Sequence, residues 1–305
     1  MDNSADIVTK AFEHRSPSRT PRGELWLGTD LLKTAHLEDT LEGHRQLIKR
    51  LGQDIICLPL SHTQAMNKTL GYRYFNLKEL KEASNIDDLF VLAVIDGPFQ
   101  RLVEKRGLMT VLNGWKKEKR AFEKTYEQER REVDALIKQC LKLSMHAIII
   151  ADDIAGERAP FIDPYDIQDL FSSFYIKAIS EIHSTHKYAM LHSCGNISTL
   201  IPAFVSYGFD GLAAVQHQTN DLISIKEKYG SSLTLMGGID GELLTAGTHS
   251  VSSLKEYKRL VRSLAPGGGF IICSSSGLYS GDFLAGIQKL YQIADEAFTG
   301  NAVSG

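Results

Sequence analysis

Short apolar runs of strand length recur along this chain, and amphipathic stretches of helical length separate them. Several runs are continuously apolar, as expected for strands that are covered on both faces. Eight strands alternating with helices is the arithmetic of a closed barrel, so we predict an α/β fold, a (β/α)8 TIM barrel with an N-terminal helical extension. The predicted strands are Leu25–Leu27, Asp54–Leu60, Phe90–Ile95, Ala147–Ala151, Tyr188–Leu191, Gly211–Val215, Leu233–Met236 and Phe270–Cys273.

The length of 305 residues suits one such barrel with insertions. No repeat or interdomain linker is visible, so we predict a single domain over 1–305, with 1–22 forming an N-terminal helix and loop and 23–300 the barrel. Residues 115–141 read as one long charged helix, either a solvated face or a docking site for a partner. Further helices are predicted from Asp163-Pro164 to Ile182, from Asn196 to Tyr207, and from Asp221 to Tyr229.

Composition and charge exclude several classes of function. The net charge of −3 gives no reason to expect nucleic acid or an anionic membrane as the main partner. No apolar run approaches the ~18 residues of a membrane span, and the polar start of the chain lacks a signal-peptide core, so we expect a cytoplasmic protein. Four cysteines in so long a chain do not indicate a disulfide framework.

Three soft ligands stand at the ends of two predicted strands. His192 and Cys194 close one strand and, being two residues apart, can point to the same side. Cys273 closes another strand and can point to the same place if the barrel brings the two strands together. One imidazole and two thiolates form a zinc donor set that leaves a fourth position free, as in catalytic sites. The alternatives are a buried histidine beside structural thiols, or a redox pair.

Other polar residues follow the predicted strands, at the edge where barrel enzymes keep their chemistry. We predict catalytic roles for Asp152, Asp153 and Asp240. Either member of the aspartate pair could instead orient His192 or cap a helix. Candidates for cofactor binding are Asn196, which could also be a helix cap, together with Ser274 and His62.

Several segments resemble the uroporphyrinogen decarboxylase superfamily. They are His192–Asn196, Tyr207–Leu212, Gly237–Asp240 and Ala265–Ile271, and the resemblance is strong from about Ala147 onward. The His-x-Cys pair with a distant Cys resembles the zinc-dependent corrinoid methyltransferases of the methylcobamide:coenzyme M type. Porphyrin decarboxylases carry an Arg-rich segment near strand one and an aspartate near strand two, both missing here, so porphyrin decarboxylation is not expected.

The resemblance implies that His192, Cys194 and Cys273 bind Zn²⁺. Gln216 stands where those methyltransferases commonly have a glutamate near the metal, and an amide oxygen is a weaker zinc donor. It also implies a corrinoid (methylcobalamin) co-substrate carried by a separate corrinoid protein, and a small-molecule methyl acceptor or donor such as a thiol or tetrahydrofolate. The competing functions are a decarboxylase or lyase acting on a non-porphyrin acid, and a corrinoid-binding protein without catalysis.

Overall fold

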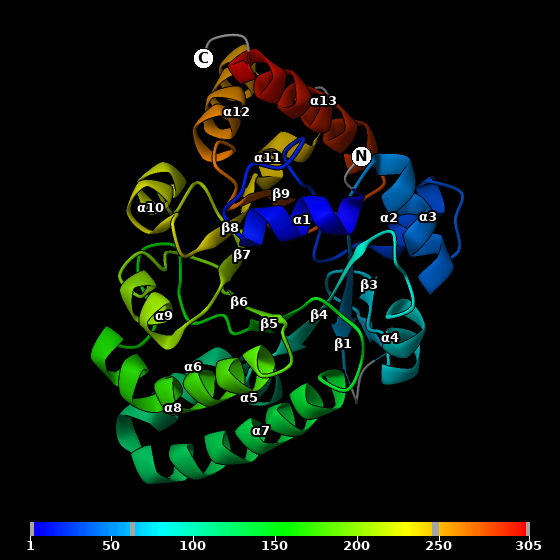
Figure 1. Cartoon of the computed structure of the whole chain (residues 1–305). Helices are drawn as coiled ribbons and strands as arrows, with labels where there is room; N and C mark the ends of the chain where they lie inside the picture. The colour runs from blue at the N-terminus through cyan, green and yellow to red at the C-terminus, as the bar shows by residue number, and fades with distance from the viewer. Residues whose placement is uncertain (1–2, 62–64, 246–249, 303–305) are drawn as a thin grey trace.

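Seven parallel strands form a curled sheet at the centre of the molecule, in the order β1-β4-β5-β6-β7-β8-β9, and helices surround it (Figure 1). The computed structural model describes residues 3–61, 65–245 and 250–302. The strands of the sheet are β1 (Ile55–Leu60), β4 (Phe90–Asp96), β5 (Ala147–Ala151), β6 (Tyr188–His192), β7 (Gly211–Val215), β8 (Thr234–Ile239) and β9 (Phe270–Ser274). A separate hairpin pairs β2 (Met66–Asn67) with β3 (Tyr72–Arg73). The predicted α/β barrel fold is thereby confirmed.

The predicted first strand is wrong in one respect, because Leu25–Leu27 forms only isolated bridges. The surrounding segment nevertheless lies between the two edge strands: the amide of Asp54 donates to the carbonyl of Arg22 (2.7 Å), and the amide of Gly23 donates to Ile272 of β9 (3.0 Å). Further along, the segment pairs instead with Leu278, beyond the end of β9. No continuous ladder forms because the partner changes within a few residues.

The helices cover the outside of the sheet (Figure 1). They are α1 (Ser4–Phe12), α2 (Thr29–Thr34), α3 (Leu41–Leu51), α4 (Leu77–Ala83), α5 (Pro98–Arg106), α6 (Leu108–Lys117), α7 (Lys119–Cys140), α8 (Pro164–His183), α9 (Ile201–Tyr207), α10 (Leu222–Tyr229), α11 (Gly241–Leu244), α12 (Val251–Leu264) and α13 (Phe283–Ala302). Within the described residues, none of these helices combines the length and apolarity needed to cross a membrane.

Helix α1 closes the amino end of the barrel. Its last residue, Phe12, stacks on Phe90 at the start of β4 (5.6 Å between ring centroids) and on Tyr188 at the start of β6 (4.2 Å). In Figure 1, α1 accordingly crosses in front of the strands. The carboxyl ends of the strands, where the predicted site residues stand, lie at the opposite end.

The barrel interior is filled by alternate residues of the strands, including Leu92, Ile149, Met190 and Met236. Because successive side chains of a strand point to opposite faces, the intervening residues form a second apolar layer against the helices. Burying each large aliphatic side chain contributes roughly 1.5–3 kcal/mol. Cys273 belongs to the interior layer and is fully buried.

Two helix predictions need correction. The helix expected over 115–141 is interrupted at Glu118, whose backbone (φ −134°, ψ 48°) is not helical, and the break lets Trp115 pack edge-on against Phe122 (5.4 Å). The helix expected from Asn196 begins only at Ile201 and ends, as predicted, before Gly208 in the left-handed conformation. Asn196 is therefore not its N-cap.

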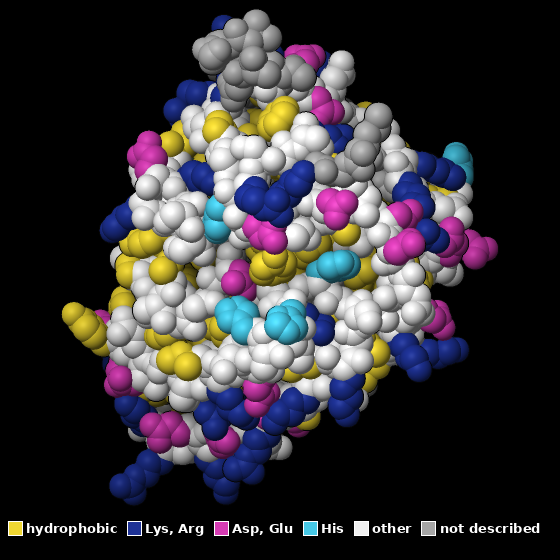
Figure 2. Space-filling model, in the orientation of Figure 1, with side chains coloured by type: hydrophobic (Ala, Val, Ile, Leu, Met, Phe, Trp, Pro, Cys, Tyr) yellow, Lys and Arg dark blue, Asp and Glu magenta, His cyan; other side chains and the backbone are white. Residues whose placement is uncertain are grey.

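The long charged helix α7 has a solvated face. Lys138 pairs with Asp134 (2.9 Å) and Arg131 with Glu127 (3.2 Å), both at the i,i+4 spacing that supports helices. In Figure 2, basic and acidic side chains are interspersed on the lower part of the molecule, where α7 lies in Figure 1.

Candidate metal centre

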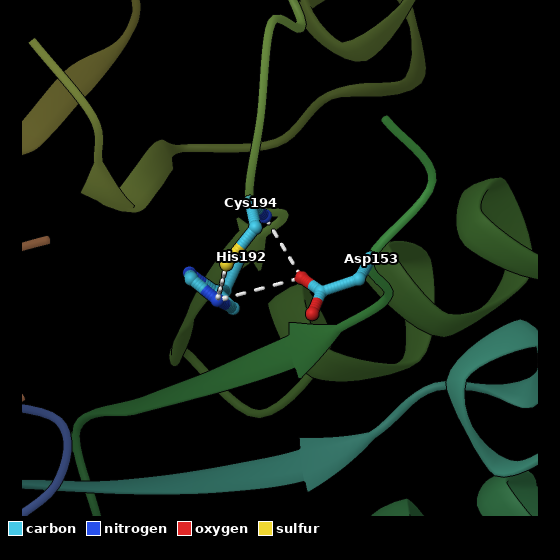
Figure 3. A group of neighbouring side chains, drawn as sticks. All are labelled: Asp153, His192 and Cys194. Carbon is cyan, nitrogen blue, oxygen red and sulfur yellow. Dashed lines mark hydrogen bonds and ion pairs between the residues drawn. The ribbon is translucent and has the colours of Figure 1, made fainter. Parts of the chain in front are cut away.

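Three potential ligands converge beyond the ends of β5 and β6 (Figure 3). His192 is the last residue of β6, and its Nε2 lies 3.7 Å from Sγ of Cys194, two residues later. Asp153, two residues beyond β5, places Oδ1 3.7 Å from the same Nε2. That oxygen also accepts a hydrogen bond from the amide of Cys194 (2.8 Å), which fixes the aspartate against the His-x-Cys turn.

The tautomer of His192 is set by the hydrogen bond of its other ring nitrogen. Nδ1 lies 2.8 Å from the carbonyl oxygen of Ala213 on β7. A carbonyl only accepts, so Nδ1 carries the hydrogen and the lone pair of Nε2 faces Cys194 and Asp153. The next residue, Ala214, forms a bulge in the β7–β8 pairing and has φ of 52°, a left-handed conformation that strains a residue with a Cβ.

The three ligand atoms lie within 4.8 Å of one another, and the two separations from Nε2 of His192 suit a tetrahedral zinc ion. Ligand distances of about 2.3 Å for sulfur and about 2.0–2.2 Å for nitrogen and oxygen place neighbouring ligand atoms roughly 3.4–3.6 Å apart. The observed separations of 3.7 Å between Nε2 and Sγ and 3.7 Å between Nε2 and Oδ1 are close to these values. The donor set of imidazole, thiol and carboxylate is also one that zinc accepts.

Without a cation, the thiol of Cys194 keeps its proton. Burial, followed by the negative charge of Asp153, raises its pKa to about 12. A divalent ion reverses this environment, since it neutralises the carboxylate and deprotonates a coordinating thiol.

The structure does not bring Cys273 into this group. Its sulfur lies 3.1 Å from the carbonyl oxygen of Ser274 and 3.7 Å from Oε2 of Glu24. The prediction assumed that a strand-end cysteine would reach the mouth of the barrel, but Cys273 points into the interior layer one residue before β9 ends. Ser275 and Ser276, beyond the strand, face the mouth in its place.

Glu24 is a buried carboxyl that the sequence analysis did not identify. It accepts hydrogen bonds from the amide (3.0 Å) and the hydroxyl of Ser274 and from the Tyr291 hydroxyl (3.2 Å). Burial raises its pKa to about 7, and the hydrogen bonds act in the opposite direction. The cluster formed by Glu24, Cys273, Ser274 and Tyr291 joins β9 to α13 and is called the α13 cluster below.

The carboxylate of Asp152 binds helices α5 and α8, and that of Asp240 binds the segment after β7. Asp152 accepts from the amide of Gln100 (2.8 Å) and from the hydroxyl of Tyr175 (2.9 Å), and burial raises its pKa to about 7. Asp240 accepts from the amides of His217 (3.1 Å) and Gln218 (3.0 Å) and from the Ser275 hydroxyl. Asp152 donates its amide to the His192 carbonyl (2.9 Å), but of the three predicted catalytic aspartates it is Asp153 whose carboxylate lies beside the His192 ring.

A cavity of about 270 Å³ opens beside the three ligands. Its lining comes from the strand ends, from α5, from the β2–β3 hairpin and from the segment after β9. The lining residues are Trp26, Asn67, Leu70, Tyr72, Asp96, Gln100, Glu104, Ala151, Asp153, His192, Cys194, Gln216, Ser275, Ser276 and Tyr279. Asp96 was missed although it directly follows a predicted strand, the same signal that identified Asp153. The aromatic lining residues and Glu104 do not directly follow a predicted strand, so nothing in the sequence placed them at the site.

The family model for uroporphyrinogen decarboxylase (URO-D) matches residues 58–297. The chain belongs to the uroporphyrinogen decarboxylase family. This confirms the resemblance noted from the sequence and extends it well before Ala147. No curated protein matches the chain.

Solved structures agree with this family's fold. A methyltransferase from Methanosarcina mazei superposes with a TM-score of 0.73 at 14% identity, covering 97% of this chain and 99% of that one. An L-ribulose 3-epimerase superposes with a TM-score of 0.56 at 10% identity, covering 94% and 98%. A D-tagatose 3-epimerase-like protein gives 0.52 at 12% identity, covering 88% and 97%. At these identities the likeness concerns the barrel fold.

The remaining site residues predicted for this member of the uroporphyrinogen decarboxylase family differ in whether they line the cavity. Gln216 lines the cavity, but its Oε1 accepts from the amide of Gly195 (2.7 Å) and so supports the His-x-Cys turn. Ser274 belongs to the α13 cluster. Asn196 accepts from the amide of Ser198 (3.1 Å) and does not line the cavity. His62 lies outside the described residues.

Proposed function

We propose that this family member is a zinc-dependent methyltransferase, which moves a methyl group between a corrinoid on a separate protein and a small acceptor such as a thiol. The proposal depends on the convergence of His192, Cys194 and Asp153 beside a cavity. The fold shared with a methyltransferase from Methanosarcina mazei supports it.

Each ligand has a separate part in holding the ion. His192 offers Nε2 because the Ala213 carbonyl fixes its tautomer. Cys194 supplies a sulfur, and the amide of Gly195, engaged by Gln216, keeps the turn in shape. Asp153 offers a carboxylate oxygen and compensates part of the positive charge. When bound, zinc would lower the pKa of an acceptor thiol in the fourth position.

The methyl transfer is a nucleophilic displacement at the methyl carbon. The acceptor sulfur forms a bond to the methyl carbon while the bond from that carbon to cobalt breaks, and the electron pair stays with the corrinoid. The thiol proton passes to water. The cavity of about 270 Å³ beside the ligands has room for a small acceptor, so the residues that line it can position the acceptor sulfur.

The test uses the zinc-loaded protein, methylcobalamin and 2-mercaptoethanol, with the thioether measured by mass spectrometry and the loss of methylcobalamin by absorbance. We expect thioether formation that needs zinc and disappears in Cys194→Ser. Cys140→Ala is the matched control, because this thiol is buried on α7 away from the cavity. Stoichiometric zinc without any methyl transfer to thiols or tetrahydrofolate would overturn the proposal, as would undiminished transfer by Cys194→Ser.

A further inference from the structure

Two kinds of side chain dominate the lining of the cavity beside the ligands, and each kind is called a wall below. Carboxyl groups form one wall, from Asp96 at the end of β4, Glu104 on α5, and Asp153. Aromatic rings form the other, from Trp26, Tyr72 and Tyr279. Among the described lining residues there is no lysine or arginine. An anionic substrate would therefore face carboxyl groups, with no lysine or arginine among these lining residues to bind it.

Basic residues near the carboxyl wall are engaged elsewhere. Arg101 on α5 donates to Glu129 of α7 (3.0 Å), and Lys105 binds the same carboxylate (2.6 Å). Burial raises the pKa of Asp96 to about 8, with the negative charge of Glu104 as the next cause, and Arg101 offsets this only in part. Burial likewise raises the pKa of Glu104. The charge of Glu104 disfavours ionisation of Asp96, an effect that a bound cation would relieve.

The aromatic wall is continuous up to the metal ligands. Tyr279 stacks on Tyr72 with ring centroids 6.0 Å apart, and Tyr72 lies 6.1 Å from Trp26. Trp26 in turn meets the ring of His192 at 4.9 Å. Aromatic rings attract organic cations through their quadrupoles, most strongly where water is excluded. Both walls therefore favour the same charge.

We propose that the small methyl acceptor or donor is an organic cation, whose ammonium group lies between the carboxyls of Asp96 and Glu104 and the rings of Trp26 and Tyr72. This inference rests on the proposed function for the position of the reacting atom, which lies at the Cys194 and His192 end. Alkylammonium compounds fit both walls, whereas thiols that end in a sulfonate or carboxylate do not.

The test compares three thiols that differ mainly in charge. They are 2-(trimethylammonio)ethanethiol, its neutral isostere 3,3-dimethylbutane-1-thiol, and 2-mercaptoethanesulfonate. The quaternary nitrogen cannot bind zinc, so any preference comes from the walls. By calorimetry on zinc-loaded protein, we expect the cation to bind at least about tenfold more tightly than the neutral thiol, and the anion most weakly.

A second measurement is independent of zinc and of catalysis. The chain has two tryptophans, so in Trp115→Phe the tryptophan fluorescence reports on Trp26 alone. We expect choline to change this signal at lower concentration than 3,3-dimethylbutan-1-ol. The double variant Asp96→Asn, Glu104→Gln should abolish the difference, whereas Glu123→Gln, an exposed carboxyl on α7, should keep it.

Equal affinity for the cation and its isostere in both measurements would overturn the inference, as would tightest binding of the sulfonate. Retention of the cation preference in the double variant would also contradict it. These results are distinguishable from a failure of the proposed function. Cation binding without methyl transfer would support the cation site and contradict the proposed methyltransferase activity. Methyl transfer to 2-mercaptoethanesulfonate in preference to the cation would support the methyltransferase activity and contradict the cation site.

Discussion

The candidate metal centre and the α13 cluster both place a cysteine next to a carboxyl group near the ends of strands, yet they differ in what their polar atoms do. In the α13 cluster, Glu24 accepts from Ser274 and Tyr291, and the cluster is sealed from solvent. In the metal centre, the polar contacts that Nε2 of His192 and Sγ of Cys194 make within the described part of the chain are with each other and with Asp153, and both residues border a cavity.

The difference shows what separates a ligand site from a structural polar cluster. A buried polar group whose hydrogen bonds are complete stabilises the packing and has no capacity left for a ligand. Ligand atoms keep that capacity when they lie together beside a cavity and do not complete one another's hydrogen bonds. On this basis Asp153 replaces Cys273 in the zinc site that we propose.

The largest expected effect separates the two cysteines. Cys194→Ser should weaken zinc binding by at least about 100-fold, because it removes a thiolate donor from the ion, a larger loss than that of an outer hydrogen-bonding partner. Cys273→Ser should bind zinc within about threefold of the unaltered protein. Competition with a chromophoric chelator measures both constants. Loss of zinc in Cys273→Ser, with the fold retained by circular dichroism, would restore that cysteine as a ligand.

The part of the site that follows from local sequence was predictable. His192 and Cys194 are two residues apart at a strand end, so their convergence depends on strand geometry alone. The barrel was equally accessible, because its continuous apolar runs are separated by helix signals. The segment 21–28 departed from regular pairing, and its change of partner from β9 to Leu278 depends on tertiary contacts.

The position of Cys273 in the interior layer was not predictable in the same way. Whether a strand-end residue reaches the mouth or the interior depends on where the strand stops, and β9 runs one residue beyond the predicted end. Glu24 illustrates a second limit. A glutamate beside Leu25 looks like an ordinary surface residue until Ser274 and Tyr291, about 250 residues later in the chain, are packed around it.

The next effect concerns the α13 cluster and stability. Glu24 has an ordinary pKa of 4.5 when unfolded and about 7 when folded, so the folded state keeps its proton to higher pH. Its contribution to stability is complete below about pH 4.5 and is lost as the pH rises through about 7. The loss is roughly 3 kcal/mol. Urea unfolding of Glu24→Gln should show a smaller fall in stability over this interval than the unaltered protein.

The control for this measurement is Glu82→Gln, a change at an exposed carboxyl on α4. This change should leave the pH dependence of the free energy of unfolding as it is in the unaltered protein. If the free energy of unfolding varied with pH in the same way in Glu24→Gln and in the unaltered protein, the pKa of Glu24 would not be raised by folding, and the prediction would be wrong. Zinc affinity should be the same in both variants, since neither residue contacts the metal centre.

The smallest expected effect is at Ala214, a residue with a strained backbone that lies beside the metal centre and not in the α13 cluster. Its φ of 52° is unfavourable for alanine and free of strain for glycine. Ala214→Gly should therefore raise the free energy of unfolding by up to about 1 kcal/mol. The neighbouring carbonyl of Ala213 holds the His192 ring, so a looser bulge should also weaken zinc binding a few-fold. Urea unfolding and chelator competition on the same protein measure both changes. A gain in stability with unchanged zinc affinity would mean that the bulge relieves packing elsewhere and does not orient His192.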